Sequence, residues 1–380
     1  MRRMKMSEAL RGPLSVISLA GGEDFTRQVD SYLKQWRSDA DSFIVEPVWP
    51  RFGTGEGKCL LHDSLRGHDV YIIADTFNHG VTYKMYGQTV PMSPDEHFAD
   101  LKRLIGAIMG KANRISVIMP MLYEGRQHKR SMRESLDCAM ALQELTNMGV
   151  SNILTFDAHD ARVQNAIPCS GFDNIHPTYQ MIKALVKNYP DISLRHEDIM
   201  IVSPDEGGMS RCIYYSSILG LDLGMFYKRR NYSVIVDGRN PIEAHEYLGR
   251  SVKGKDIIVV DDMISSGESM FEVAQQLKEK GAKRIFMFAS FGLFCKGLDR
   301  FDEMYEKGVF DRIFTTNLTY RDEEVKKREW YVEVNLCKYV ALIIDTLNHD
   351  QSIAELLKPA ERINKLLDKL PPEHRNKPEA

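Results

Sequence analysis

The sequence predicts an α/β protein in which mainly parallel sheets are flanked by helices and arranged as two domains. Its 380 residues, 43% of them apolar, exceed what one ordinary hydrophobic core accommodates. Helical periodicity alternates with short apolar runs, which are typical of parallel strands buried on both faces. These runs lie at 68–75, 114–120, 152–159, 198–205, 256–262, 284–291 and 311–317.

Two predicted helices begin with a capping box, in which a serine is followed three residues later by a glutamate. They are expected over 93–108 and 131–149. A third helix, 269–281, directly follows a predicted strand. The segment 78–92 is expected to be a loop without obvious chemistry, and the charged tail 358–380 to be frayed or disordered.

The composition favours a cytoplasmic protein that binds neither nucleic acid nor a membrane. The net charge is −3, from 50 basic and 53 acidic side chains, so no general electrostatic attraction to nucleic acid or lipid is expected. The first residues are basic but are not followed by the apolar run of a signal peptide. No apolar stretch approaches the roughly twenty residues of a membrane-spanning helix. The six cysteines are scattered, without the close pairs of a zinc site or disulfide framework.

The most informative stretch is 257–269, an apolar strand followed by two acids, a small polar turn and a helix. The unpaired N–H groups and positive dipole of a helix start suit a phosphate dianion. Asp261 and Asp262 would suit vicinal sugar hydroxyls. The plainer interpretation is that the acids end a strand and the serines cap a helix, but two consecutive acids after a wholly apolar strand favour a functional site.

This stretch resembles the phosphoribosyl-pyrophosphate-binding motif that type I phosphoribosyltransferases share with ribose-phosphate pyrophosphokinases. The resemblance implies that Asp261 and Asp262 contact ribose and that the following turn holds its 5-phosphate, through Ser265, Ser266, Gly267, Glu268 and Ser269. Glu268 stands where the family usually has glycine. We expect its carboxylate to point outward, because backbone amides rather than this side chain would contact the phosphate.

Further segments resemble the pyrophosphokinases rather than the transferases. Lys228 and Arg230 match the family's catalytic loop, where they would neutralise charge on the transferred group. Asp157 and His159 match an Asp-x-His segment that holds magnesium and ATP. Asp205, in Ser-Pro-Asp-x-Gly-Gly, would bind magnesium, ribose or both. Alone, each segment also fits a basic turn, an ordinary hydrogen-bonded pair or a glycine turn.

Two segments resemble ATP contacts and depart from the family pattern. Arg126 and Gln127 match an Arg-Gln pair that approaches ATP, but His128 replaces the usual aspartate. The segment Arg-Phe-Gly-Thr-Gly-Glu at 51–56 resembles one that stacks on and hydrogen-bonds adenine held by a neighbouring subunit. It contributes Phe52, Thr54, Gly55 and Glu56 to the predicted ATP site. Thr54 replaces an aspartate, so nucleotide preference is left open.

The resemblance identifies the chain as a divergent member of the ribose-phosphate pyrophosphokinase family, with two tandem phosphoribosyltransferase-like domains at 1–175 and 176–357 and a charged tail at 358–380. It implies magnesium-dependent transfer of the pyrophosphoryl group of ATP to the 1-hydroxyl of ribose 5-phosphate. Magnesium would be held through Asp157, His159 and Asp205. The resemblance further implies a mobile lid at 228–241 and a homo-oligomer, commonly a hexamer.

Two alternatives stay open at this point. A phosphoribosyltransferase would share the ribose-phosphate turn but would need neither the Arg-Gln pair nor the Asp-x-His segment. A non-catalytic regulatory relative would keep the fold, as the departures at Thr54, His128 and Glu268 allow. Against it, Lys228 and Arg230 are both present.

Overall fold

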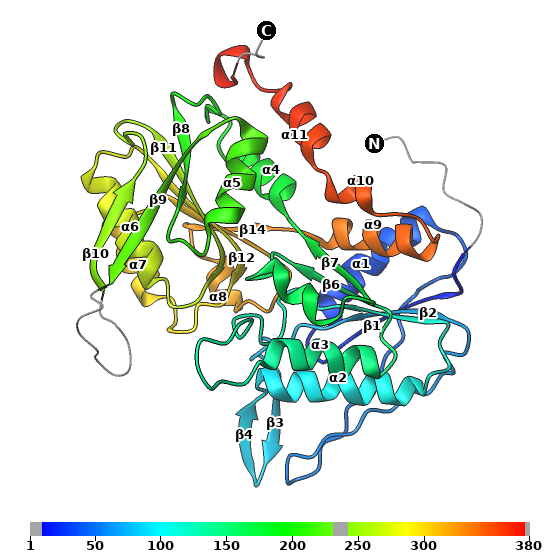
Figure 1. Cartoon of the computed structure of the whole chain (residues 1–380). Coiled ribbons are helices and arrows are strands. Elements are labelled where there is room, and N and C mark those ends of the chain that lie inside the picture. Colours follow the sequence, from blue (N-terminus) through cyan, green and yellow to red (C-terminus); the bar gives the residue numbers. More distant parts are fainter. Residues whose placement is uncertain (1–9, 231–241, 377–380) are drawn as a thin grey trace. The chain divides into compact units, whose positions relative to one another are not determined.

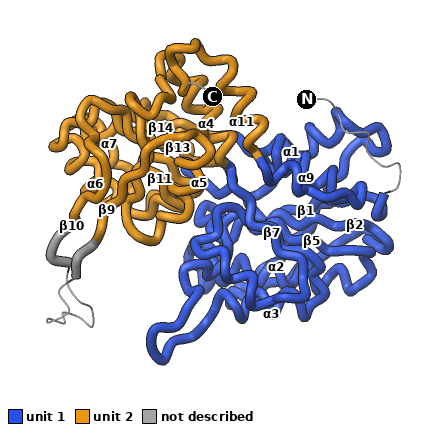
Figure 2. Tube along the Cα trace, turned by 45° about the horizontal axis from the view of Figure 1, so that its top comes forward, with its two compact units in different colours: residues 1–177, 317–322, 335–358 blue, residues 178–316, 323–334, 359–380 orange. Residues whose placement is uncertain are grey.

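The computed structural model describes residues 10–230 and 242–376 (Figure 1). The chain forms two compact units, coloured separately in Figure 2. Unit 1 contains Met1–Pro177, Asn317–Asp322 and Asn335–Lys358, and unit 2 contains Thr178–Thr316, Glu323–Val334 and Pro359–Ala380. The first boundary lies near the expected residue 175. Residues 317–322 and 335–358, however, pack with unit 1, whereas the family resemblance places residues up to 357 in the second domain.

Unit 1 is built on a parallel sheet in the order β1-β2-β5-β6-β7. The residues of β1 and β2 are buried throughout, as is typical of parallel strands covered on both faces. The strands are β1 Leu14–Ser18, β2 Asp69–Ile73, β5 Arg114–Ile118, β6 Asn152–Phe156 and β7 Gly171–Ile175. The helical elements of unit 1 are α1 Glu23–Trp36, α2 Pro94–Ile108, α3 Asp137–Asn147, η1 Ala161–Ala166, α9 Cys337–Asn348 and α10 Ala354–Leu357.

Helix α9 belongs to unit 1 because it packs on α1 and completes a buried polar cluster. Asp69, at the start of β2, accepts two hydrogen bonds from Arg114, at 2.8 and 2.7 Å, and one from Asn348 of α9, at 3.0 Å. At the end of α1, Arg37 donates to Asn348 at 2.7 Å. A buried charge needs such pairing to be tolerated. This pairing ties the C-terminal part of the chain to the first sheet.

Helix α2 has the predicted capping box, whereas the second predicted box does not form. The Ser93 hydroxyl accepts from the amide of Glu96, and the Ser93 amide donates to the Glu96 carboxylate. The other helix, α3, begins at Asp137, six residues later than predicted. Glu134, expected to close the second box, instead accepts a hydrogen bond from Gln127 at 3.1 Å, so tertiary contact replaces the local cap.

The segment 78–92, expected to be a plain loop, contains the β-hairpin β3 Thr82–Met85 and β4 Gln88–Pro91. The hairpin extends away beyond α2 in Figure 1. Tyr86 and Gly87 form its two-residue turn, with φ of 47° and 81°. Two positive φ values suit the twist of paired strands. The usual Asn-Gly or Asp-Gly signal is absent here, which is why the sequence pattern did not predict this hairpin.

Unit 2 is built on a mixed sheet in the order β10-β9-β8-β11-β12-β13-β14, in which β10 pairs antiparallel with β9 and the other pairs are parallel. The strands are β8 Ile199–Ser203, β9 Asp222–Arg230, β10 Ile242–Leu248, β11 Asp256–Ile264, β12 Ile285–Gly292, β13 Arg312–Thr316 and β14 Tyr331–Val334. The helical elements are α4 Thr178–Asn188, α5 Met209–Leu219, α6 Glu268–Glu279, α7 Asp299–Glu306, α8 Glu323–Lys326, α11 Ala360–Leu367 and η2 Pro372–His374. All seven predicted apolar runs are confirmed as strands.

The C-terminal tail is ordered over its described part, so the expectation of a frayed segment is wrong. Helix α11 packs on α4, with Ile363 fully buried and Arg362 over the ring of Tyr179 at 5.3 Å. Further along, the amide of Leu194 donates to the carbonyl of His374 at 2.7 Å. The high charge of this segment concealed Ile363, the one buried residue of α11. None of the helices within 10–230 and 242–376 combines the length and apolar character of a membrane span.

Candidate active site

Strand β11 and helix α6 are joined by a short turn with the form of a phosphate site. The turn holds Ser265, Ser266 and Gly267, and α6 begins at Glu268. Gly267 has a φ of 84°, a left-handed conformation that glycine adopts without steric cost. The backbone N–H groups at a helix start lack partners within the helix and suit an anion. A Cβ atom at Gly267 would lie 2.6 Å from Cζ of Phe301, so the core behind the turn requires glycine here.

The two predicted ribose-binding acids lie near the end of β11, beside an arginine. The Asp261 carboxylate accepts from the amide of Asp262 at 2.9 Å. Nη1 of Arg211, from α5, lies 3.7 Å from Asp261 and 4.0 Å from Asp262. Burial, and then the negative charge of Asp262, raise the pKa of Asp261 above its ordinary value. The site therefore holds a carboxyl group that is poorly stabilised in its charged form until a partner arrives.

Glu268, which departs from the family pattern, is exposed at the first position of α6. A carboxylate in the first turn of a helix interacts favourably with the helix dipole. Ser269 beside it is exposed as well. The turn therefore accommodates the acid at its rim without burying it against the backbone amides.

The Asp205 segment follows β8, the strand that pairs with β11. The Asp205 carboxylate accepts from the amides of Gly207 and Gly208 at 2.9 and 3.3 Å, and the Ser203 hydroxyl donates to the Asp205 carbonyl at 2.7 Å. Parallel neighbours end at the same edge of a sheet, where α/β proteins bind ligands. The structure thus brings the Asp205 turn and the β11 carboxylates to one edge of the second sheet.

Lys228 and Arg230 lie at the end of β9, which pairs with β8. The backbone of Lys228 is in register with His245 of β10, and that of Arg230 with Ile242. Most of the predicted lid, 231–241, lies outside the described residues. The predicted catalytic residues are therefore on the strand next to the one that leads to Asp205.

In unit 1, the predicted adenine segment forms a tight turn. The amide of Phe52 donates to the Glu56 carbonyl at 2.9 Å, and that of Gly55 donates to the Phe52 carbonyl at 2.8 Å. Gly55 has a φ of 96°. The Phe52 side chain is 58% exposed, as a stacking surface requires. The hydroxyl of Thr54 donates to the Glu56 carboxylate at 2.9 Å, so the substituted residue hydrogen-bonds the acid that was expected to face the base.

The predicted Arg-Gln pair lies in the loop after β5. Arg126 is exposed, whereas the Gln127 amide is folded against its own loop. Its Nε2 donates to Glu134 and to the carbonyl of Ser135, at 3.1 and 3.0 Å. Gln127 would have to break these two hydrogen bonds before its amide could contact a purine.

Asp157, expected to help bind metal, is buried at the end of β6 and paired with a histidine that the sequence pattern did not single out. Its Oδ1 lies 2.5 Å from Nδ1 of His176, the residue after β7. The side chain is 3% exposed, and the backbone φ is 38°. Bulky residues avoid this region, and aspartate tolerates it better than most. The pairing orients His176, and a metal held by Asp157 would have to share this carboxylate with the histidine.

His159 and His128 come together from different segments, with ring centroids 5.4 Å apart. His128 Nε2 lies 3.5 Å from the Asp160 carboxylate. Burial is the main cause that lowers the pKa of His128, with His159 and Lys129 acting in the same direction against Asp160. The residue that replaces the family's aspartate is therefore held near the exposed His159.

Three side chains at these sites were missed by the sequence interpretation, namely Arg211, His176 and Asp160. A signal existed for His176, because it directly follows a short strand that pairs parallel with β6, and the carboxyl ends of parallel neighbours share an edge. Arg211 lies about one helical turn after Gly207 and Gly208. Its place beside Asp261 can be recognised only once β8 and β11 are known to be neighbours.

The described ranges contain no group of three or more His, Cys, Asp or Glu side chains arranged to hold a metal ion. The Asp205 carboxylate accepts from two amides and that of Asp157 is paired with His176. Magnesium commonly binds proteins through one or two carboxylates together with substrate phosphates and water. The donors present fit a metal that arrives with its nucleotide better than one held in a protein cage.

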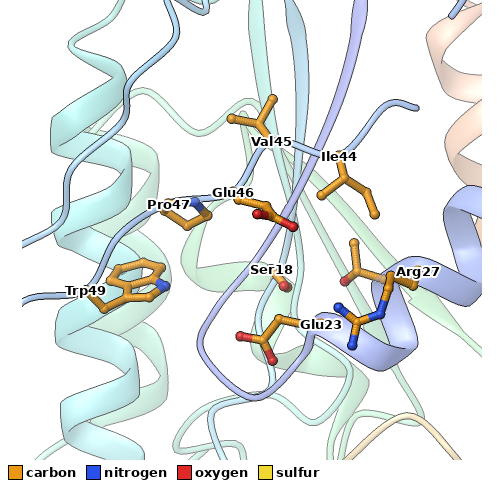
Figure 3. Close-up of a pocket in the computed structure, with 9 residues that line it drawn as sticks. Ser18, Glu23, Arg27, Ile44, Val45, Glu46, Pro47 and Trp49 are labelled. Carbon is orange, nitrogen blue, oxygen red and sulfur yellow. The ribbon is translucent and has the colours of Figure 1, made fainter. Parts of the chain in front are cut away.

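A cavity of about 230 Å³ lies in unit 1 and is lined by none of the predicted site residues (Figure 3). Figure 3 shows Glu23 and Glu46 around it, with the indole of Trp49 at one side. The Thr26 hydroxyl, which also lines the cavity, has no hydrogen-bond partner within the described residues. Trp49 stands three residues before Phe52, so this cavity borders the segment that carries the adenine turn.

Both halves of the chain match known family models. Residues 14–149 match the N-terminal domain of ribose phosphate pyrophosphokinase, and residues 171–323 match the phosphoribosyl transferase domain. A ribose-phosphate pyrophosphokinase of Prochlorococcus marinus is 30% identical over 278 residues, covering 72% of this chain and 74% of the relative. That of Vibrio cholerae is 27% identical over 311 residues, covering 80% and 89%.

Among solved structures, phosphoribosylpyrophosphate synthetase from Mycobacterium smegmatis matches with a TM-score of 0.71. The match covers 89% of this chain and 99% of that chain at 20% identity, and at that identity it speaks for the fold alone. It confirms the predicted architecture of two phosphoribosyltransferase-type domains, each a mainly parallel sheet flanked by helices. By its two matched domains and its curated relatives, this chain belongs to the ribose-phosphate pyrophosphokinase family.

Proposed function

We propose that the chain is a ribose-phosphate pyrophosphokinase that transfers the pyrophosphoryl group of ATP to the 1-hydroxyl of ribose 5-phosphate, giving phosphoribosyl pyrophosphate and AMP. The observation that carries this proposal is the β11–α6 junction. There two adjacent carboxylates near a strand end precede a glycine-shaped phosphate turn, next to the Asp205 turn at the same sheet edge. The family's enzymes use ATP and ribose 5-phosphate.

In this proposal unit 2 binds the sugar phosphate. The amides and hydroxyls of the turn 265–269 would hold the 5-phosphate dianion, and Asp261 and Asp262 would accept from the ribose hydroxyls. Arg211, 3.7 Å from Asp261, acts against the burial that raises the pKa of Asp261 and would favour its charged, accepting form. Lys228 and Arg230 would neutralise the transferring group, because catalysis of phosphoryl-type transfer is mostly positioning and electrostatic stabilisation.

The ATP contacts are proposed in unit 1. Phe52 would stack on the base within the turn formed with Thr54, Gly55 and Glu56, and Arg126, Gln127 and His159 would contact the nucleotide. Asp157, His159 and Asp205 would also hold magnesium, with the Asp157 carboxylate shared with His176. When bound, magnesium would neutralise phosphate oxygens and orient the chain of phosphates. The segment 228–241 would exclude water from the site and so protect ATP from hydrolysis.

We further propose that the active protein is a cytoplasmic homo-oligomer, a hexamer by family resemblance, because the family's adenine segment serves ATP held by a neighbouring subunit. Residues 14–149 match the N-terminal domain of ribose phosphate pyrophosphokinase. This match supports a pyrophosphokinase over a simple phosphoribosyltransferase.

The test is a coupled assay for AMP released from ATP and magnesium, run with and without ribose 5-phosphate and with GTP in parallel. With ATP labelled at the γ-phosphorus, the label should appear in phosphoribosyl pyrophosphate rather than in free phosphate. Asp261→Ala should abolish sugar-dependent AMP, while Gly308→Ala, two residues after the end of α7, should retain it. A folded wild-type protein that binds ribose 5-phosphate but releases no AMP would favour the non-catalytic relative.

A further inference from the structure

The β3–β4 hairpin holds the turn that we assign to the nucleotide base. The amide of Tyr86 donates to the Gly53 carbonyl at 2.8 Å. A Cβ atom at Gly55 would lie 2.9 Å from the Met85 sulfur, so the hairpin packs directly against the far side of the turn. The two segments therefore form one continuous surface of unit 1.

The base of the hairpin is fixed by ordinary structural contacts. Arg51, which precedes the turn, lies over the Tyr83 ring at 4.9 Å and pairs with the buried Asp100 at 2.6 Å. The Tyr83 hydroxyl hydrogen-bonds Glu96 of α2. These contacts explain Tyr83 and Arg51 as parts of the fold.

Tyr86 is different, because the fold gives no reason for an aromatic residue at its position. It occupies the first central position of the hairpin turn with a φ of 47°, where asparagine, aspartate or glycine is favoured and a bulky side chain is disfavoured. Its side chain is 79% exposed, so it contributes little to a core. A strained and exposed aromatic residue points to a role outside folding.

We propose that Tyr86 is a second base-contacting residue, which together with Phe52 offers aromatic surface to the purine of the bound nucleotide. Both rings are exposed, at 79% and 58%, and both project from backbone joined by the Tyr86–Gly53 hydrogen bond. The hairpin thereby determines nucleotide affinity in this chain. This inference rests on the proposed function, because that function assigns the Phe52 turn to the base.

The chemistry of the turn favours recognition by stacking. Glu56 already accepts a hydrogen bond from Thr54 at 2.9 Å, which reduces what it offers to the edge of a base. Stacking on an aromatic ring tolerates any base, since each has a π-face. Tyr86 should therefore contribute to the binding of adenine and guanine nucleotides alike.

The test compares Tyr86→Asn and Tyr86→Phe with a matched control, Thr89→Ala, an exposed residue of the same hairpin. Binding of α,β-methylene-ATP and its guanine counterpart is measured by equilibrium titration, and melting temperature is measured for each variant. Asparagine suits the positive φ, so Tyr86→Asn should melt no lower than wild type. It should raise the dissociation constant for both nucleotides by about fivefold or more, in line with the cost of losing one stacking contact. Tyr86→Phe and Thr89→Ala should bind within about twofold of wild type.

An unchanged dissociation constant in Tyr86→Asn would overturn the inference, as would an equal loss in Thr89→Ala or a wild-type protein that binds neither nucleotide. The AMP assay on wild type is read separately. If wild type makes phosphoribosyl pyrophosphate while Tyr86→Asn binds nucleotide normally, the inference fails and the proposed function stands. If the wild-type protein is inactive but binds nucleotide, and Tyr86→Asn loses that binding, the proposed function fails and the base contact stands.

Discussion

The shape of the phosphate turn can be tested by comparing two glycines of unit 2 that share one backbone conformation. Gly267 and Gly308 have φ of 84° and 68°, so alanine at either position incurs the left-handed penalty of about 1 kcal/mol. Around Gly308 an added Cβ meets nothing within 4 Å, whereas at Gly267 it would lie 2.6 Å from Phe301 and 2.8 Å from Phe271. Carbon atoms prefer separations of about 3.5 to 4.0 Å.

The extra overlap at Gly267 must be relieved by moving two packed rings, and overpacking of this kind costs about 1 to 3 kcal/mol. Gly267→Ala should therefore lower the free energy of unfolding by about 3 kcal/mol, against about 1 kcal/mol for Gly308→Ala. It should also weaken ribose 5-phosphate binding, which Gly308→Ala should leave intact.

Urea unfolding of unit 2 measures the difference. Trp330 stacks on Phe301 with ring centroids 5.5 Å apart, so its fluorescence reports this packing once Trp36 and Trp49 of unit 1 are replaced by phenylalanine. Both variants should shift the midpoint at an unchanged slope. Equal shifts in the two variants would refute the idea that Phe271 and Phe301 fix the turn.

Three further predictions concern the catalytic groups. The pKa of Asp261 is raised from its ordinary 3.8 to about 8. Between these values the folded protein binds more protons than the unfolded chain, so this group's contribution to stability falls as pH rises through the window. Asp261→Asn should thus melt above wild type at pH 8, with a smaller difference at pH 5, and should be inactive; a lower melting temperature at pH 8 would contradict the assigned burial. Lys228→Ala should reduce turnover by about a hundredfold or more with little change in ribose 5-phosphate affinity in a direct binding assay. Removing magnesium with a chelator should abolish AMP release but leave the melting temperature unchanged, because no described side-chain cluster is held together by metal; a large drop in melting temperature would reveal a structural ion.

The sequence pattern predicted the parallel strands well because strands buried on both faces carry nearly continuous apolar runs, as β11 and β12 do. Helix α2 was equally predictable, since its cap depends on residues three positions apart. The start of α3 was not, because Glu134 is drawn to Gln127 by a loop contact. Local signals fail wherever a more distant partner competes for the same side chain.

The residues of the candidate site likewise fall into those that a local sequence motif predicts and those that only the fold brings together. Motif positions such as Asp261 and Gly267 stand out because a strand, a turn and a helix follow one another within a dozen residues. Arg211 and His176 owe their places to neighbouring strands that are separated along the chain, and pairing order is absent from a one-dimensional pattern. Tyr86 was missed for a third reason, since a tyrosine in a turn contradicts local propensity.

The return of the chain to unit 1 has a consequence for how the protein is made. Helix α1 ends at Trp36 and its partner α9 begins at Cys337, so the ribosome must add about 300 residues before the first unit can close. At the usual elongation rate of about 5 to 20 residues per second, roughly 15 to 60 s pass between the synthesis of α1 and that of its partner α9. Unit 1 therefore cannot mature in the order of synthesis, and a fragment ending at residue 175 should emerge as a client for chaperones rather than as an independent domain.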